Sequence, residues 1–312
     1  MISRSTSTGI PPSGSVGVSG VFVKLAVPGS LTNTPDTPTL RLMDKLSPES
    51  IAAGLGTRWL ARPDRIYYYE RTGSTNDEAR RLALAGAPEG TLVIAEEQTA
   101  GRGRLGRRWL APAGEALLFS ILFLPPLAAH EAYPLTMVAS LACLHAVEAE
   151  TGLHPTLKWP NDLLLKGKKL AGMLSELGQV DDRLYCIIGI GLNVNVDFAA
   201  APELRTQATS LRLSLSHPVP RLPLLQAILR RIEAGYDALR AGHSPYPAWV
   251  THLGTLGQAV RVTTSEGSFA GVATSADPDG ALYITLPDGS MRRILTGDVQ
   301  GLRPFVETQG NS

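Results

Sequence analysis

Several features are scarce in this chain of 312 residues, and the scarcity of cysteine excludes the most. Only Cys143 and Cys186 are present, both in apolar surroundings and without the spacing of metal ligands. Such a pair supports neither a disulfide-rich scaffold nor a zinc finger. We therefore expect two buried free thiols in a reducing compartment, the cytoplasm.

Long apolar runs and an export signal are also missing. No apolar stretch reaches the roughly 18 residues that a membrane-spanning helix requires. The N-terminus has no basic segment followed by an apolar core and a small-residue cleavage site. The sequence therefore predicts a cytoplasmic protein that makes no contact with a membrane.

Net charge is nearly zero, since 29 Lys and Arg residues are balanced by 28 Asp and Glu residues. Such a chain lacks the broad positive field with which proteins hold nucleic acids. Aromatic residues make up 6% of the sequence, and apart from Trp109 none is interleaved with basic residues as in an RNA-binding surface. Positive charge is instead concentrated in one short segment, which favours a small anionic ligand.

That segment, residues 96–109, has the sequence EEQTAGRGRLGRRW. Arginine stays charged at physiological pH, and its planar fork of donors suits phosphate and carboxylate oxygens. Glycine allows unusual backbone dihedrals and lets a ligand approach the backbone N–H groups. Trp109 ends the segment with a flat face on which a purine can stack. We name residues 101–109 the arginine loop and predict that it binds an anion.

The three glycines of the loop also have the G-x-G-x-x-G spacing of a dinucleotide-binding fingerprint. A strand at 91–95 precedes them, as that fingerprint requires. A helix should then begin at once, but Pro112, Gly114 and a strand-like run at 117–124 follow instead. A Walker loop is excluded because no Gly-Lys-Ser/Thr ends the segment. A solvated basic loop or a nucleic-acid patch remains the alternative to a small-ligand site at this point.

The pattern along the chain predicts an α+β fold. Ser47 caps a short helix, and Thr75 with Glu78 forms a capping box for a second one. Two longer helices are predicted at 131–151 and 222–239. Between 156 and 195, apolar runs are joined by short connections, which indicates antiparallel hairpins rather than a doubly wound sheet.

Composition divides the chain into four segments. The N-terminal segment is rich in Ser, Thr, Pro and Gly, so we expect a disordered extension with at most one short strand at 21–27. Too few ordered residues precede Tyr67 for a winged helix, which argues against DNA binding. Short strands with Asp-Gly turns predict a small C-terminal barrel. The expected boundaries are 1–45 for the extension, 46–255 for the α+β domain, 256–306 for the barrel and 307–312 for the tail.

Two further stretches carry groups suited to phosphate chemistry. Lys158 and Lys169 flank a bend that contains Asn161, and Asp162 adds a carboxylate that could hold a metal ion or orient a lysine. The residues that leave room for a ligand against the sheet are Gly172, Gly189 and Gly191. Acyl-adenylate formation needs such groups, because a carboxylate must be held in line with an α-phosphate whose charge is neutralised by lysine, arginine and Mg²⁺. No Ser-His-Asp or Cys-His arrangement competes, since the six histidines stand in no motif.

Taken together, these motifs resemble those of the biotin protein ligase family. They are STN at 74–76, GRGRLGRRW at 101–109, KWPND at 158–162 and KLAG at 169–172, in this order. The resemblance spans about 51–304, and it implies a class II synthetase-like catalytic domain with a mixed, largely antiparallel sheet, followed by an SH3-like β-barrel. It also implies the reaction. Biotin and ATP give biotinyl-5′-AMP and pyrophosphate, and a lysine of a biotin carboxyl carrier domain, in acetyl-CoA carboxylase or a related carboxylase, then accepts the biotinyl group.

The resemblance also implies a role for individual residues, position by position. The residues expected around the biotin head are Ser74, Thr75, Asn76 and Gln98, and those expected to line the biotin slot are Gly172, Gly189 and Gly191. The residues expected to grip the biotin carboxylate and the adenylate phosphate are Gly101, Arg102, Arg104 and Lys169, of which the last three are the expected catalytic residues. The residues expected at the nucleotide are Arg104, Arg107, Trp109 (beneath the adenine), Asn161, Lys169 and Asn193.

Cofactors and partners follow from the same resemblance. It implies ATP and Mg²⁺ as co-substrates, biotin as substrate and no permanently bound cofactor, and it leaves the metal ligands open. Pairing of two copies through a sheet edge is a further expectation. The lack of a winged helix predicts the short form without a DNA-binding domain. Lipoate protein ligase is the alternative, because it shares a stretch like that at 161–172, but its Arg-Arg-x-x-Gly-Gly-Gly loop is missing.

Overall fold

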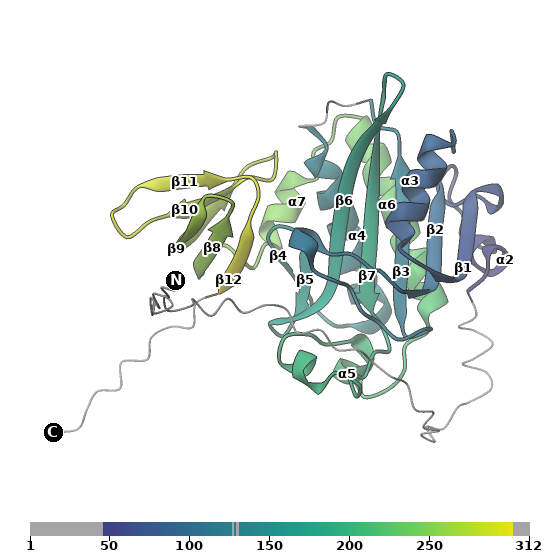
Figure 1. The fold of residues 1–312 in the computed structure, drawn as a ribbon, viewed down its shortest axis with the longest axis horizontal. Helices are drawn as coiled ribbons and strands as arrows, with labels where there is room; N and C mark the ends of the chain where they lie inside the picture. Colours follow the sequence, from purple (N-terminus) through teal and green to yellow (C-terminus); the bar gives the residue numbers. More distant parts are fainter. Residues whose placement is uncertain (1–45, 127, 129–130, 302–312) are drawn as a thin grey trace, which may run out of the picture. The chain divides into compact units, whose positions relative to one another are not determined.

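The computed structural model describes residues 46–126, 128 and 131–301 (Figure 1). The predictions for the N-terminal extension, including the strand at 21–27, and for the C-terminal tail therefore lie outside the described residues. Within them the chain forms a seven-stranded sheet, a separate five-stranded sheet and several helices. None of the described helices is long and apolar enough to cross a membrane.

The larger sheet is mixed, with the strand order β1-β2-β3-β7-β6-β5-β4. Its strands are β1 (Ile66–Thr72), β2 (Leu92–Gln98), β3 (Ala116–Phe123), β4 (Thr156–Lys158), β5 (Asp162–Leu165), β6 (Lys168–Val180) and β7 (Arg183–Asn193). Only β1 and β2 run parallel, and every other neighbouring pair is antiparallel. The predicted hairpins between 156 and 195 are confirmed, and with them the mixed, largely antiparallel sheet.

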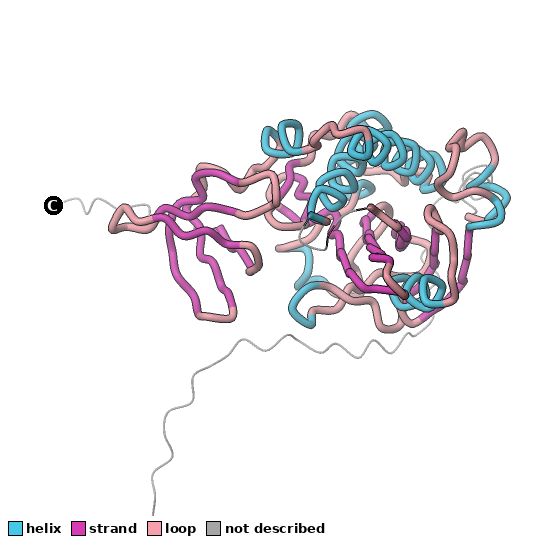
Figure 2. The backbone as a smooth tube through the Cα atoms, turned by 90° about the horizontal axis from the view of Figure 1, so that it is seen from above, coloured by secondary structure: helices cyan, strands magenta, loops and turns pink. Residues whose placement is uncertain are grey.

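Helices cover both faces of this sheet. The α-helices are α2 (Pro48–Ala52), α3 (Thr75–Leu84), α4 (Tyr133–Thr151), α5 (Leu211–Leu215), α6 (Arg221–Arg240) and α7 (Tyr246–Thr251), and short 3-10 turns lie at Pro63–Arg65, Arg104–Gly106 and Pro202–Thr206. The two long helices α4 and α6 lie side by side on one face, and α3 lies on the other (Figures 1 and 2). Because α4 is buried around most of its circumference, its sequence is apolar on nearly all sides.

Strand β3 contributes side chains to both faces of the larger sheet. All of its residues are buried, and successive side chains point to opposite sides. Phe119 and Ile121 belong to the core that includes α4 and α6, whereas Leu122 packs with Ala79 of α3. Ser120 is fully buried yet polar, and it points to the α3 side. This one hydroxyl within an apolar run marks the side of the sheet on which polar chemistry is located.

The C-terminal strands form the second sheet, antiparallel throughout, with the order β11-β10-β9-β8-β12. They are β8 (Ala259–Thr264), β9 (Gly267–Ala276), β10 (Leu282–Thr285), β11 (Met291–Ile294) and β12 (Asp298–Gly301). The short strands joined by Asp-Gly turns agree with the prediction from sequence, whereas β12 was not predicted because its four residues carry no apolar alternation. Trp159 reaches this part of the chain, since its Nε1 donates to the carbonyl of Gly280 at 2.7 Å. The domain boundary at 255/256 stays a prediction.

The capping predictions had different outcomes. Ser47 caps α2 as expected, in a capping box with Ser50. For α3 the prediction was wrong, because Ser74 occupies the cap position and its side chain makes no capping bond. The backbone N–H of Thr75 instead donates to Oε1 of Gln98 at 2.7 Å. A side chain from β2 therefore replaces the local cap, which a reading of local sequence cannot anticipate.

Candidate functional site

The three predicted slot glycines lie in adjacent strands on the face of the sheet that carries α3. Gly191 of β7 pairs with Gly172 of β6, and Gly189 lies two residues before Gly191 along β7. A Cβ atom on Gly191 would lie 2.5 Å from Cε2 of Trp109, and one on Gly189 would overlap the side-chain oxygen of Asn76. We call these three residues the glycine floor. Their lack of side chains lets Trp109 and Asn76 lie directly against the strands.

The arginine loop, which lies between β2 and β3 in the sequence, crosses this floor. Its two halves are joined by backbone hydrogen bonds. The backbone N–H of Gly103 donates to the carbonyl of Arg107 at 2.7 Å, and that of Trp109 to Gly101 at 3.0 Å. Leu105 at the tip has a φ of 55°, a left-handed backbone conformation that residues other than glycine rarely adopt. The loop therefore presents its side chains in several directions rather than as one basic surface.

Two of the four arginines are held by carboxylates. The Nη2 atom of Arg102 donates to Asp77 of α3 at 2.7 Å and to Glu176 of β6 at 3.0 Å. Arg107 pairs with Asp298 of β12 through both terminal guanidinium nitrogens, with Nη1 3.2 Å from Oδ1. The hydrogen bonds to Asp298 raise the pKa of the Arg107 guanidinium. The loop is thus tied to both sheets by ion pairs.

The other two arginines have no carboxylate partner within ion-pair distance among the described residues. Arg108 donates to the carbonyl of Thr99 at 2.7 Å. Arg104 has a weaker contact, with Nη1 3.5 Å from the side-chain oxygen of Asn161. Burial lowers the pKa of the Arg104 guanidinium, because a charge removed from water is disfavoured. Arg104 is therefore a partly desolvated cation that an anionic ligand would stabilise.

A chain of polar groups lies between the start of α3 and the glycine floor. The hydroxyl of Thr75 is 3.0 Å from Oε1 of Gln98, and Ser120 Oγ lies 2.7 Å from that hydroxyl and 2.6 Å from Oδ1 of Asn76. Each of these three oxygen–oxygen contacts needs one proton, but only the two hydroxyl groups supply protons, because the end atoms, Gln98 Oε1 and Asn76 Oδ1, are both acceptors. The cluster therefore suits a polar ligand with which its hydrogen bonds can be rearranged.

Lys169 lies at the edge of the glycine floor. Its Nζ is 2.6 Å from Oδ1 of Asp162, as an ion pair without the angles of a hydrogen bond, and 5.4 Å from the ring centroid of Trp109. A Cβ on Gly172 would lie 3.1 Å from both Lys169 and Trp109. Of the two uses considered for Asp162, this contact supports the orientation of a lysine. Among the described residues, no group of three or more His, Cys, Asp or Glu side chains is placed to hold a metal ion.

The two predicted asparagines are engaged with backbone. Asn161 donates to the carbonyl of Met173 across the β5–β6 pair and stays near Arg104. Asn193 is buried at the end of β7, and its Nδ2 donates to the carbonyl of Thr209 at 3.1 Å. Asn161 is therefore beside the arginine loop, whereas Asn193 bonds the segment that precedes α5.

Three residues of this site were missed by sequence reasoning: Asp77, Ser120 and Glu176. Asp77 follows the Ser-Thr-Asn motif directly, where the local sequence indicates only the start of a helix. Ser120 lies within an otherwise apolar strand. The one signal in the sequence is that a polar residue interrupts this apolar run. Glu176 lies in a strand whose outer half alternates between intermediate and exposed positions. Nothing in its local sequence distinguishes it from a solvated glutamate.

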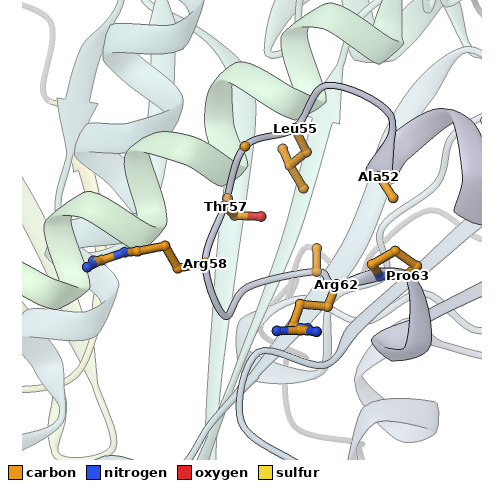
Figure 3. Close-up of a pocket in the computed structure, with 8 residues that line it drawn as sticks. Ala52, Leu55, Thr57, Arg58, Arg62 and Pro63 are labelled. Atoms are coloured by element: carbon orange, nitrogen blue, oxygen red, sulfur yellow. The ribbon is translucent and has the colours of Figure 1, made fainter.

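A small hollow lies elsewhere, along the segment 52–63 (Figure 3). Its volume of about 160 Å³ is smaller than that of ordinary ligand pockets. Arg58 points away from it and pairs with Asp237 of α6. None of the predicted site residues lines this hollow. We therefore place the functional site at the glycine floor.

A mixed sheet with a glycine floor beneath an arginine loop, followed by a small antiparallel sheet, defines a ligase of the biotin and lipoate class. Residues 68–193 match the Biotin/lipoate A/B protein ligase family, and residues 255–300 match the Biotin protein ligase C terminal domain. The bifunctional ligase/repressor BirA of Bacillus subtilis is 35% identical over 260 residues, which cover 82% of this chain and 79% of that protein. The biotin–[acetyl-CoA-carboxylase] ligase of Mycobacterium tuberculosis is 34% identical over 269 residues, covering 84% and 96%.

Solved structures agree with this assignment. The biotin protein ligase of Aquifex aeolicus in complex with biotin and ATP has a TM-score of 0.66 and 29% identity, covering 77% of this chain and 99% of that one. The chain belongs to the biotin protein ligase family and is a ligase enzyme of that family. The expected fold class is thereby confirmed. The match to the C-terminal domain of biotin ligases also favours biotin over the lipoate alternative.

Proposed function

We propose that this ligase activates biotin as biotinyl-5′-AMP and transfers the biotinyl group to a lysine of a biotin carboxyl carrier domain. The observation that supports this most directly is that three segments distant in sequence lie close together in space. The arginine loop, Lys169 of β6 and the polar start of α3 come from three separate parts of the sequence, and all border the same glycine floor. An acid-activating enzyme needs these three elements together: a polar site for the substrate head, cations for its carboxylate and a flat face for the base.

We assign the polar head of biotin to the start of α3. The ureido ring both donates and accepts hydrogen bonds, and the residues Ser74, Thr75, Asn76 and Gln98 offer both kinds of partner. The apolar bicycle is assigned to the site bordered by the glycine floor and by Asn76 and Trp109, the side chains that lie directly against it. Biotin's ring system is rigid, so a preformed surface loses little entropy on binding.

The cations are assigned to the acid and phosphate groups. Arg104 is partly desolvated without a carboxylate partner, so an anion would repay the cost of its burial. Lys169 is oriented by Asp162 and lies beside Trp109, which we assign to the adenine. Gly101 and Arg102 are assigned to the carboxylate end of biotin. Further nucleotide contacts are assigned to Arg107, Asn161 and Asn193.

The chemistry then proceeds in two displacements. A carboxylate oxygen of biotin attacks the α-phosphorus of ATP, and the bond from that phosphorus to the pyrophosphate oxygen breaks. The Nζ of the acceptor lysine next attacks the acyl carbon, AMP leaves, and the lysine loses a proton as the amide forms. Lys169 and Arg104 stabilise the negative charge that develops at the α-phosphate.

Mg²⁺ is proposed to enter with ATP rather than through a dedicated protein cage. The described residues offer no cluster of three acidic or histidine ligands, and Asp162 is already paired with Lys169. Magnesium commonly keeps several waters and binds through substrate phosphates with one or two carboxylates, which this site allows.

The test is incubation of the full chain with MgATP and either biotin or lipoate, in the presence of a biotin carboxyl carrier domain. We expect pyrophosphate release and a gain in carrier mass equal to one biotinyl group, with biotin alone. Release with lipoate but not with biotin would overturn the proposal. Cytoplasmic location and pairing of two copies through an edge of the larger sheet stay predictions, and sedimentation with biotin and MgATP tests the second.

A further inference from the structure

Glu176 joins three separate parts of the site through one carboxylate. Its Oε2 accepts from Nδ2 of Asn76 at 2.8 Å and from Nη2 of Arg102 at 3.0 Å. Its Oε1 lies 3.1 Å from Nη2 of Arg80. The side chain is only 20% exposed, so these contacts are partly shielded from water. Strand β6, helix α3 and the arginine loop therefore meet at a single residue to which the sequence assigns no role.

The first consequence is the orientation of the Asn76 amide. Its Nδ2 faces two acceptors, the Leu174 carbonyl at 3.3 Å and Glu176. Its Oδ1 must then face Ser120, whose Oγ lies 2.6 Å away. If the amide turned over, its oxygen would face the Glu176 carboxylate, which is repulsive. Glu176 and the Leu174 carbonyl together therefore fix which polar atom of Asn76 faces the glycine floor, and Glu176 makes the shorter of the two contacts.

The second consequence concerns Arg102. Its Nη2 is held by both Asp77 and Glu176, so the guanidinium has a defined direction. Its Nε–H is buried and has no hydrogen-bond partner among the described residues. A buried donor without a partner costs free energy until an acceptor is supplied. The two carboxylates thus hold Arg102 with one donor available for a ligand.

We propose that Glu176 is a positioning residue for biotin, which sets biotin affinity by fixing Asn76 and Arg102 together. This inference rests on the proposed function and goes beyond it, because Glu176 is assigned no contact with biotin, ATP or the reacting atoms. Arg102 is assigned to hold the carboxylate of bound biotin, whereas Lys169 and Arg104 are assigned to the charge at the α-phosphate. The effect of Glu176 should therefore fall on the binding of biotin and leave the KM for ATP and kcat nearly unchanged.

The test compares three variants of the full chain. Glu176→Gln keeps the shape but removes the negative charge, so the bonds that Asn76 and Arg102 donate to the same oxygen lose their charge assistance. We expect the KM for biotin to rise about tenfold, or ~1.4 kcal/mol. The KM for ATP and kcat should stay within about twofold of the unchanged enzyme. Glu176→Asp keeps the charge but moves it away from Asn76 and Arg102, so we expect a smaller rise in the KM for biotin. Arg80→Gln removes the other ion pair of Glu176 and should leave the KM for biotin within about twofold.

Calorimetric titration of each protein with biotin, without nucleotide, separates this inference from the proposed function. If the unchanged enzyme binds biotin but releases no pyrophosphate, the proposed function fails while the comparison of biotin affinities still decides the role of Glu176. Equal biotin affinity in Glu176→Gln and the unchanged chain would overturn the inference. The inference would also be overturned if Arg80→Gln lost as much biotin affinity as Glu176→Gln, or if Glu176→Gln lost equal affinity for biotin and for ATP. In either case the effect would not come from Asn76 and Arg102. If Glu176→Gln does not fold, wild-type affinity in Glu176→Asp would overturn it.

Discussion

Arg221 and Glu96 form a largely buried ion pair near the end of β2, the strand that leads into the arginine loop. Nη1 of Arg221 lies 2.5 Å from Oε2 of Glu96 and 3.3 Å from the carbonyl of Ala116. Arg221 is the first residue of α6, and Glu96 lies two residues before Gln98, which serves the polar cluster at α3. The pair therefore connects the helical layer to the strand from which the site is built.

Removing one charge of this pair should destabilise the protein strongly. We expect Arg221→Met to lower the free energy of unfolding by about 3 kcal/mol, because Glu96 is left buried without its partner. Urea denaturation measures this. The control is Arg240→Met, whose ion pair with Glu89 is half exposed and should be worth less than about 1 kcal/mol. Similar losses in the two variants would contradict the buried role of Arg221.

Lys169 should act in the chemical step. We expect Lys169→Met to lower kcat for biotin-dependent pyrophosphate release by about 10²–10³-fold, since a preorganised cation at the α-phosphate is lost. The neighbouring Lys168 is exposed and donates to the carbonyl of Arg205, so Lys168→Met should keep near-normal turnover. A Lys169→Met enzyme with normal kcat would remove this lysine from the mechanism.

The glycine floor should not tolerate a methyl group. A Cβ on Gly191 would meet the indole of Trp109 at 2.5 Å, so Gly191→Ala must displace the ring. We expect pyrophosphate release to fall at least about tenfold, since misplaced groups are costly to catalysis. Gly73 has open space around its own Cβ position, so Gly73→Ala serves as the control. Full activity in Gly191→Ala would show that the contact with Trp109 is dispensable.

Glu115 gives a pH-dependent prediction. Burial, followed by the nearby charge of Asp197, raises the pKa of its carboxyl group, and its Oε2 has no hydrogen-bond partner among the described residues. A raised pKa means that the folded state favours the protonated form, so ionisation of Glu115 costs stability above the ordinary carboxyl pKa of ~4.3. Glu115→Gln should therefore raise Tm at pH 7, and the gain should disappear near pH 4. An equal gain at both pH values would argue against ionisation as the cause, and the exposed Glu150→Gln should show no gain.

The two cysteines should be unreactive in the folded protein. Burial raises the pKa of Cys143 to about 12 and that of Cys186 to about 11. Because the thiolate is the reactive form, neither should be alkylated by iodoacetamide at pH 8 until the chain is unfolded. Mass spectrometry before and after denaturation checks this. Rapid modification of the native protein would contradict the burial of both thiols.

Most of the architecture could be predicted because it depends on local pattern. The hairpins of β5, β6 and β7 follow from short turns between apolar runs, and α4 and α6 from long periodic segments. The strand β12 and the helix α5 were missed, because each has only four or five residues and a weak pattern. Short elements of this kind are stabilised by tertiary contacts rather than by their own propensity.

The candidate site was predicted in outline but not in its pairings. Trp109, Lys169 and the glycine floor were named from their motifs, and the structure brings them together. From the sequence, Arg102, Arg104 and Arg107 are each expected to contact the ligand, and no carboxylate partner within the protein is predicted for them. Instead Arg102 and Arg107 are paired with carboxylates from distant parts of the chain, and Arg104 is left as the partly buried cation.

The sequence by itself determined the chemistry available to this protein: a glycine-rich loop of permanent cations, a lysine near an aspartate, and polar residues at the start of a helix. Those properties belong to residue types and short spacings, which need no fold to be recognised. Only the tertiary structure decided how the charges are shared, because Glu176, Asp77 and Asp298 reach the arginine loop across large separations in sequence. An ion pair is set by distance in space, and the chain order does not contain that distance.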